Sequence, residues 1–315
     1  MRFLKQLATG VAFSLLAGCM TTVPNEVSRT GASVDLAAYE PPKGYARLFS
    51  PAVHSYRPGL VSVGDPVRRG ARSERFELRG EDCGGSDCNE PRARAEIQMT
   101  PSETTAALGE DIWYGWSFYN ATVPNFSRDT SLRLVFGQWT MGGKHRPIFR
   151  LIQLGKDEGD FSACADTICR GANLGQGDVV LQLEDIAEAL NWGDAQNNGY
   201  VCRLFDMQAQ RGQWVDLTLN TNFSTRGDGY VRVWVNGNLA CDYQGPVVSA
   251  TSAASGLPPR HRRGVFSSWT KRWEKANGSA RKPTMIVYYD EFRAGKTRAD
   301  VDVRQRAQAG QGPTD

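Results

Sequence analysis

The feature that most constrains the fold is a set of segments in which apolar and polar side chains alternate. In residues 112–119, Ile112, Tyr114, Trp116 and Phe118 fall on one face of an extended chain. This alternation is typical of a β-strand that packs one face against a core. Four further segments share the interpretation, and they span residues 132–139, 214–219, 230–235 and 285–292.

Residues 214–219 and 230–235 flank a turn-like sequence at 225–229, so they predict a β-hairpin. The valines of its second arm face the core, and Trp234 faces outward. Only residues 180–191 have a helical pattern. Thirty-three glycines and eight tryptophans also suit a turn-rich β-protein. We therefore predict an all-β sandwich of two antiparallel sheets.

The N-terminus carries the pattern of a lipoprotein signal. Arg2 and Lys5 precede a short apolar run, which ends at Leu16-Ala17-Gly18-Cys19. In that interpretation residues 1–18 are removed and Cys19 is acylated as the first mature residue. Because Met20 lacks the acidic character associated with inner-membrane retention, we expect an outer-membrane location in the bacterial cell envelope. The alternative is an ordinary secretory signal in which Cys19 is incidental.

The rest of the chain divides by composition. Residues 19–45 predict a flexible tether, 46–297 a folded domain, and 298–315 a disordered tail. The net charge of +3 gives no argument for binding nucleic acid. No second apolar stretch is long enough to cross a bilayer, so the lipid is the expected membrane contact. We expect a monomer.

Six cysteines follow Cys19, and an even number in an oxidising compartment indicates disulfides. Six cysteines allow fifteen pairings. Spacing favours Cys83–Cys88 and Cys164–Cys169 as short loops, which leaves Cys202–Cys241 to join two distant segments. A zinc site is the weaker alternative, because no histidine lies beside the close pairs.

Several polar residues lie where they could bind an acidic sugar. Arg94 and Glu96 share one face of a predicted strand, and arginine can hold a carboxylate with two hydrogen bonds. Gln138 precedes Trp139 on another strand, and Lys144 and His145 follow a glycine turn. His145 could remove a proton. The alternatives are a solvated ion pair for Arg94 and Glu96, a packing role for Gln138 and Trp139, and a solvated face around Arg262.

The order of these motifs resembles the polysaccharide lyases of the heparin lyase I and glucuronan lyase type. The shared pieces cover about residues 75–296, and they are Arg94-x-Glu96, 113–119, Gln138-Trp139, 233–237, 262–266 and 288–295. The resemblance implies a concanavalin-like β-jelly roll. It also implies an acidic polysaccharide as substrate and cleavage by β-elimination.

Carried over by position, Arg94 and Gln138 bind and neutralise a uronate carboxylate, with Glu96 orienting Arg94 and Arg262 standing where relatives often have lysine. His145 and Tyr289 are the candidates for proton transfer. Trp139, Lys144 and Trp234 complete the predicted substrate-binding set. No metal site is assigned, although calcium stays open because some relatives use it.

Two positions depart from the family pattern. Thr140 stands where a histidine commonly follows the Gln-aromatic pair, and Phe266 stands where a tyrosine is expected. Phenylalanine cannot exchange a proton. A carbohydrate-binding module without catalysis is therefore the main alternative. A glycoside hydrolase would need paired carboxylates, for which Glu184, Asp185 and Glu188 are the candidates.

Overall fold

A computed structural model describes most of the chain from Glu40 onward. The described residues are 40–48, 52–101, 106–124, 133–143, 145–153, 169–170, 177–186, 201–268, 270–278 and 280–314. The chain divides into residues 1–34 and a compact unit, Asp35–Asp315. Cys19, the signal 1–18 and most of the tether 19–45 thus lie outside the described residues. The described residues all belong to the compact unit.

Two sheets make up this unit within the described part of the chain. The eight-stranded sheet has the order β1 (Tyr45–Leu48), β4 (Arg92–Met99), β14 (Arg260–Ser268), β6 (Arg133–Thr140), β7 (Pro147–Gln153), β9 (Asp178–Leu183), β10 (Val201–Asp206), β8 (Cys169–Arg170). The seven-stranded sheet has the order β13 (Asn238–Gln244), β12 (Tyr230–Val235), β11 (Trp214–Thr221), β5 (Ile112–Asn120), β15 (Met285–Gly295), β3 (Arg72–Leu78), β2 (Tyr56–Leu60). Neighbouring strands are antiparallel, except that β8 and β10 are parallel.

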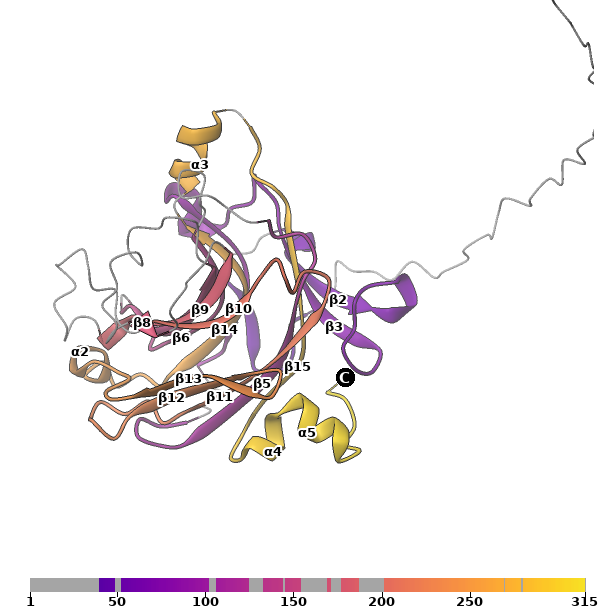
Figure 1. Ribbon diagram of the computed structural model, residues 1–315. Coiled ribbons are helices and arrows are strands. Elements are labelled where there is room, and N and C mark those ends of the chain that lie inside the picture. Colours follow the sequence, from indigo (N-terminus) through magenta and orange to yellow (C-terminus); the bar gives the residue numbers. More distant parts are fainter. Residues whose placement is uncertain are drawn as a thin grey trace, which may run out of the picture. The chain divides into compact units, whose positions relative to one another are not determined.

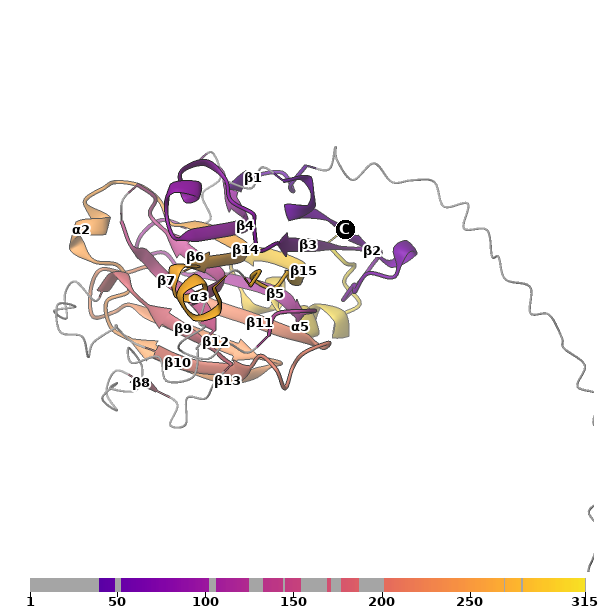
Figure 2. The ribbon, with the colours of Figure 1, turned by 90° about the horizontal axis from the view of Figure 1, so that it is seen from above.

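The chain passes repeatedly between the sheets, because β4, β6 and β14 lie in one and β3, β5 and β15 in the other. Figures 1 and 2 show the sheets as two stacked layers. One large apolar core fills the space between them. This connectivity and layering confirm the expected all-β jelly-roll sandwich.

Short helices lie in the connections and at the C-terminal end. They are η2 (Val53–Ser55), η3 (Val61–Val63), η4 (Gly85–Asn89), α2 (Ala250–Ala253), α3 (Thr270–Asn277), α4 (Arg298–Val301) and α5 (Val303–Gln308). Figure 1 shows α3 at the top of the view and α4 and α5 beneath β5 and β15. No helix among the described residues is long and apolar enough to span a membrane.

The predicted strands are confirmed where they can be compared. Ile112, Tyr114, Trp116 and Phe118 of β5 all face the core with at most 3 % exposure. The predicted hairpin forms from β11 and β12, with Leu219 opposite Val233. The helical prediction for 180–191 is wrong for its first residues, because 180–183 belong to β9. That strand pairs with β7 and β10 and is buried on both faces, which removes the alternation that marks a strand.

Two of the predicted disulfides are confirmed. Cys83–Cys88 closes a short loop around η4, and Cys202–Cys241 joins β10 of one sheet to β13 of the other. The second bond therefore links the two layers near one edge of the sandwich. The third predicted pair involves Cys164, which lies outside the described residues.

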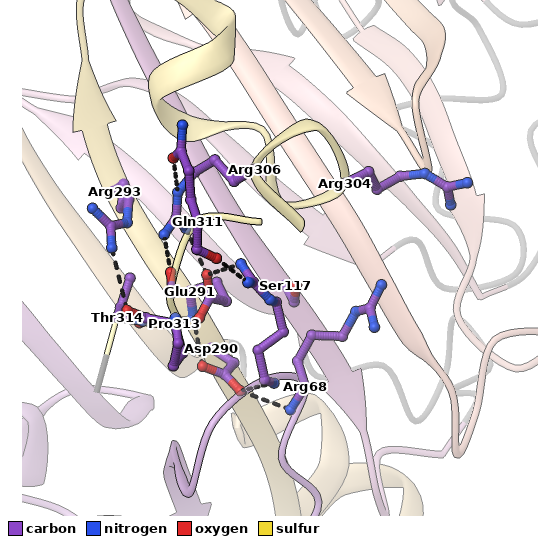
Figure 3. Close-up of polar contacts among 12 residues, drawn as sticks. Arg68, Ser117, Asp290, Glu291, Arg293, Arg304, Arg306, Gln311, Pro313 and Thr314 are labelled. Atoms are coloured by element: carbon purple, nitrogen blue, oxygen red, sulfur yellow. Dashed lines mark hydrogen bonds and ion pairs between the residues drawn. The ribbon is translucent and has the colours of Figure 1, made fainter. Parts of the chain in front are cut away.

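The predicted disordered tail, 298–315, is instead ordered through residue 314. Thr297 and Asp300 form a capping box at the start of α4, and Asp302 caps α5. Arg306 of α5 is 1 % exposed and donates to Glu291 of β15 (2.6 Å). Figure 3 shows the end of the chain gathered around Glu291. The folded domain therefore extends beyond the predicted limit of 297, because the tail completes a buried ion pair.

Candidate active site on the eight-stranded sheet

A row of amide and guanidinium side chains crosses the outer face of the eight-stranded sheet. Strand register places Arg262 opposite both Gln98 and Gln138, Gln138 opposite Arg150, and Arg150 opposite Gln182. The row forms because side chains alternate along each strand, so the neighbours of these residues enter the core instead. We call Gln98, Arg262, Gln138, Arg150 and Gln182 the polar row.

Glu96 lies beside the centre of the polar row and is 1 % exposed. Its carboxyl group accepts from Nε2 of Gln138 (2.8 Å) and from Nη1 of Arg94 (3.4 Å). Burial raises the pKa of Glu96, and the nearby charges of Arg94 and Arg262 only partly oppose this.

Arg94 is held by a carboxylate that the sequence analysis did not single out. Asp87, in the loop closed by Cys83–Cys88, accepts from Nε and from Nη2 (2.9 Å) of Arg94. The guanidinium also lies over the ring of Phe266, 4.8 Å from its centre. Burial lowers the pKa of Arg94, but Asp87 and Glu96 outweigh it and raise the pKa overall. The predicted uronate clamp is thus already paired within the protein.

Arg262 differs from Arg94 in having no ion pair among the described residues. Its Nε is buried and has no hydrogen-bond partner in that part of the chain. Burial lowers the pKa of Arg262, as do Arg94 and Arg260, although Glu96 opposes them. Arg150, by contrast, pairs with Glu184 (2.7 Å) and donates from Nε to Gln182 (3.2 Å). Arg262 is therefore the cation of the polar row that is poised for an external anion.

His145 lies in the turn after β6, which Gly142 and Gly143 form with φ of 85° and 62°. Thr140, at the position where relatives have histidine, accepts from the backbone N of Gly142 (3.0 Å) and supports this turn. Nδ1 of His145 lies 3.5 Å from Oγ of Ser252 in α2. Ser252 in turn donates to Asp185 (2.6 Å). His145 therefore contacts a buried polar pair instead of Gln138.

Comparison with known families decides the assignment. The family model described as polysaccharide lyase matches residues 51–293. The chain belongs to the polysaccharide lyase family. The resemblance seen in the sequence motifs is thereby confirmed. No curated protein matches this lyase in a direct comparison of sequences.

Solved structures similar to this polysaccharide lyase include other lyases. The endo-β-1,4-glucuronan lyase from the fungus Trichoderma reesei has 14 % identity and a TM-score of 0.47, over 75 % of this chain and 86 % of that one. The alginate lyase AlyC3 has 9 % identity and a TM-score of 0.43, over 71 % and 74 %. The family 7 alginate lyase A1-II′ has 11 % identity and a TM-score of 0.42, over 75 % and 86 %. The family assignment rests on the family model.

The three aromatic residues of the site predicted for the lyase lie away from the polar row. Trp139 is fully buried and packs its ring 4.7 Å from that of His261, because it faces the core when Gln138 faces outward. Trp234 lies on the other sheet, stacked on Trp113 at 5.3 Å with Arg298 over its ring. Neither tryptophan can contact a sugar bound at Gln138. Lys144 lies outside the described residues.

Tyr289 is the third, and the structure places its side chain in the core instead of on the sheet face that carries Gln138. Its ring is 1 % exposed within the core, and its hydroxyl donates to the backbone oxygens of Phe136 and Gly264 (2.9 Å to the latter). Burial raises the pKa of Tyr289 well above its ordinary value. Tyr289 borders a cavity of about 350 Å³ that none of the polar row lines. Its hydroxyl supports β6 and β14 from within the sandwich.

Sequence reasoning missed Asp87, Arg150 and Gln182. Asp87 had a signal in the sequence, since it is the acidic residue between two cysteines of a short loop.

The carboxylates of the glycoside hydrolase alternative have other partners. Glu184 pairs with Arg150, Asp185 accepts from Ser252, and Glu188 lies outside the described residues. Among the residues that the structure describes, no three His, Cys, Asp or Glu side chains form a group that could hold a metal ion.

Proposed function

We propose that this chain cleaves a uronate-containing glycan by β-elimination on the polar row. The observation that carries the proposal is the partly exposed guanidinium of Arg262, which lies opposite Gln138, has a buried Nε without a hydrogen-bond partner, and has no ion pair among the described residues. A buried N–H without an acceptor is costly, and a carboxylate ligand that reaches it removes that cost. A uronate supplies such a carboxylate on every acidic sugar residue.

The polar row would activate the proton next to that carboxylate. Arg262 binds the uronate, and the second N–H of Gln138, whose Nε2 already donates to Glu96, is available to it. Neutralising the carboxylate stabilises the negative charge that develops when the C5 proton leaves. The C5–H electron pair then forms the C4=C5 double bond as the C4–O bond breaks, and water protonates the leaving oxygen.

We assign the removal of the proton to His145. The chain has three histidines. His261 is 2 % exposed in the core, where burial lowers its pKa well below the ordinary value, and Nε2 of His54 is 2.8 Å from Asp82. His145 is partly exposed, at the end of the strand that carries Gln138. Ser252 links His145 to Asp185, which directly follows Glu184, the partner of Arg150 in the polar row.

The test is to incubate the full chain with glucuronan, alginate and heparin, with a neutral glucan as the control. The expected result is new unsaturated sugar ends, detected by ultraviolet absorbance and mass spectrometry, from an acidic polymer only. His145→Gln should lower that rate about 10²- to 10⁴-fold. Saturated ends would indicate hydrolysis. Binding without cleavage would leave a carbohydrate-binding module.

We also propose that acylation of Cys19 anchors the chain to the outer membrane. The support is the sequence pattern alone, in which small residues follow a short apolar run and end at cysteine. Cys19→Ala should move the protein from the membrane to the soluble fraction of fractionated cells. An unchanged distribution would contradict the anchor without affecting the lyase proposal.

A further inference from the structure

The proposed base, His145, ends a buried chain of polar side chains from three separate parts of the sequence. Asp185 follows β9, Ser252 lies in α2, and His145 lies in the turn between β6 and β7. Asp185 and Ser252 are 2 % and 1 % exposed, whereas His145 is partly exposed. Buried polar groups this far from solvent need partners, so the protons in the chain can be assigned.

Asp185 is the acceptor of this network. It accepts from the backbone N of Ser249 (2.7 Å), from Oγ of Ser249 (3.1 Å) and from Oγ of Ser252 (2.6 Å). The hydroxyl of Ser249 also accepts from the backbone N of Ser252 (3.1 Å), which caps α2. A serine hydroxyl has one proton. The proton of Ser252 is therefore committed to Asp185.

Because its proton is used, Oγ of Ser252 can only accept from His145. The contact of 3.5 Å to Nδ1 is long, as catalytic hydrogen bonds often are before a substrate is bound. A proton on Nδ1 leaves Nε2 with a free electron pair in the neutral ring. The order Asp–Ser–His also differs from a serine hydrolase, where the histidine lies between the other two and takes the serine proton.

We propose that Asp185 and Ser252 are positioning residues that hold His145 in the tautomer with a bare Nε2, the form that can accept the C5 proton. This inference rests on the proposed function for its catalytic meaning, but the tautomer itself does not depend on catalysis. Asp185 acts through Ser252, and neither residue touches the sugar. The pair also fixes the direction of the imidazole ring, because Ser252 is anchored in α2.

The first measurement is nitrogen-15 NMR of the full chain, which reports the tautomer of each of the three histidines. The signal lost in His145→Gln identifies His145. The expected result is a proton on Nδ1 in the native protein, and its partial transfer to Nε2 in Ser252→Ala. Ser252→Thr should restore the native spectrum, and Thr251→Ala, an exposed neighbour on the same helix, should leave it unchanged. A native ring protonated on Nε2, or a spectrum unaffected by Ser252→Ala, overturns the proposal.

The second measurement is steady-state kinetics on the polymer that the native chain cleaves. Ser252→Ala and Asp185→Asn should lower kcat about 10- to 10²-fold with KM unchanged, and Ser252→Thr should recover most of the rate. Thermal melts identify any variant that fails to fold. In that case, the rate measured for Ser252→Thr tests whether the hydroxyl at position 252 is needed for catalysis. If the native chain cleaves nothing, the proposed function fails while the tautomer result still stands. If kcat is unchanged in folded variants, the positioning role is wrong although the lyase proposal survives.

Discussion

Arg306 of the C-terminal helix α5 forms a buried ion pair with Glu291 of β15. The Nη1–Oε2 distance is 2.6 Å, and the two side chains are 1 % and 0 % exposed. Glu291 also accepts from Nη1 of Arg69 (3.2 Å) and from the backbone N of Thr314 (2.9 Å). Figure 3 shows Arg306 and Thr314 beside Glu291. A single buried acid therefore ties the end of the chain to the seven-stranded sheet.

Arg306→Ala should lower the free energy of unfolding by about 3–5 kcal/mol, because it leaves the Glu291 carboxylate buried with less compensation. Chemical denaturation measures this loss. Arg304→Ala, an exposed arginine on the same helix, is the control and should change stability by less than about 0.5 kcal/mol. Equal effects from the two variants would contradict a specific role for the Arg306–Glu291 pair.

Asp290, next to Glu291, should make stability depend on pH. Burial raises the pKa of Asp290 to about 7, although it accepts from the backbone N of Arg68, Arg69 and Glu291. The folded state thus binds this proton more tightly than the unfolded state, whose pKa is near 3.8. The stabilisation is complete below the unfolded value and is lost as pH rises through about 7.

Asp290→Asn should therefore flatten the fall in the free energy of unfolding between about pH 4 and pH 7. Denaturant titrations at a series of pH values give the slope. Asp242→Asn, an exposed aspartate on β13, should keep the native slope. A slope that survives in Asp290→Asn would assign the pH dependence to another group.

Arg262→Ala should abolish uronate cleavage while leaving the fold as stable as before. The change removes a guanidinium that has no ion pair among the described residues, so it breaks no salt bridge in that part of the chain. The rate should fall by about 10² or more, as when one group that stabilises transition-state charge is lost. Arg232→Ala, on the seven-stranded sheet, is the matched control for an arginine lost from a strand. Full activity in Arg262→Ala would place the uronate elsewhere.

Arg94→Ala should act mainly on stability, in contrast to Arg262→Ala. It leaves the buried Asp87 carboxylate with one arginine fewer, which should cost about 3–5 kcal/mol of unfolding free energy. Arg226→Ala breaks an exposed pair with Asp228 and should cost less than about 1 kcal/mol. If Arg94→Ala keeps native stability but no longer binds the acidic glycan, Arg94 contacts the substrate after all.

Much of the architecture could be predicted because a strand with one buried face carries its period in the sequence. Alternating apolar residues predict β5, namely Ile112, Tyr114, Trp116 and Phe118. Val231 and Val233 likewise predict the core face of β12. Segment 180–183 lacks that signal, because the strand is buried on both faces and the apolar Val180 shares a face with Gln182. The same period places Gln138 and Trp139 on opposite faces of β6, so the two side chains cannot share one binding surface.

The sequence by itself determined the sandwich, two of the disulfides, and the strand face that carries Glu96 and Gln138. Only the tertiary structure decided which arginine is paired, because Asp87 contacts Arg94 from a separate disulfide loop, whereas Arg262 has no such partner among the described residues. The tertiary structure also decided that the tail is folded, because helices as short as α4 and α5 are not stable alone. The capping box at Thr297 determines where α4 begins. The position of α5 depends on the contact between its Arg306 and the buried carboxylate of Glu291 on β15. Pairing between charges distant in the chain depends on burial and geometry, and neither is written in local sequence.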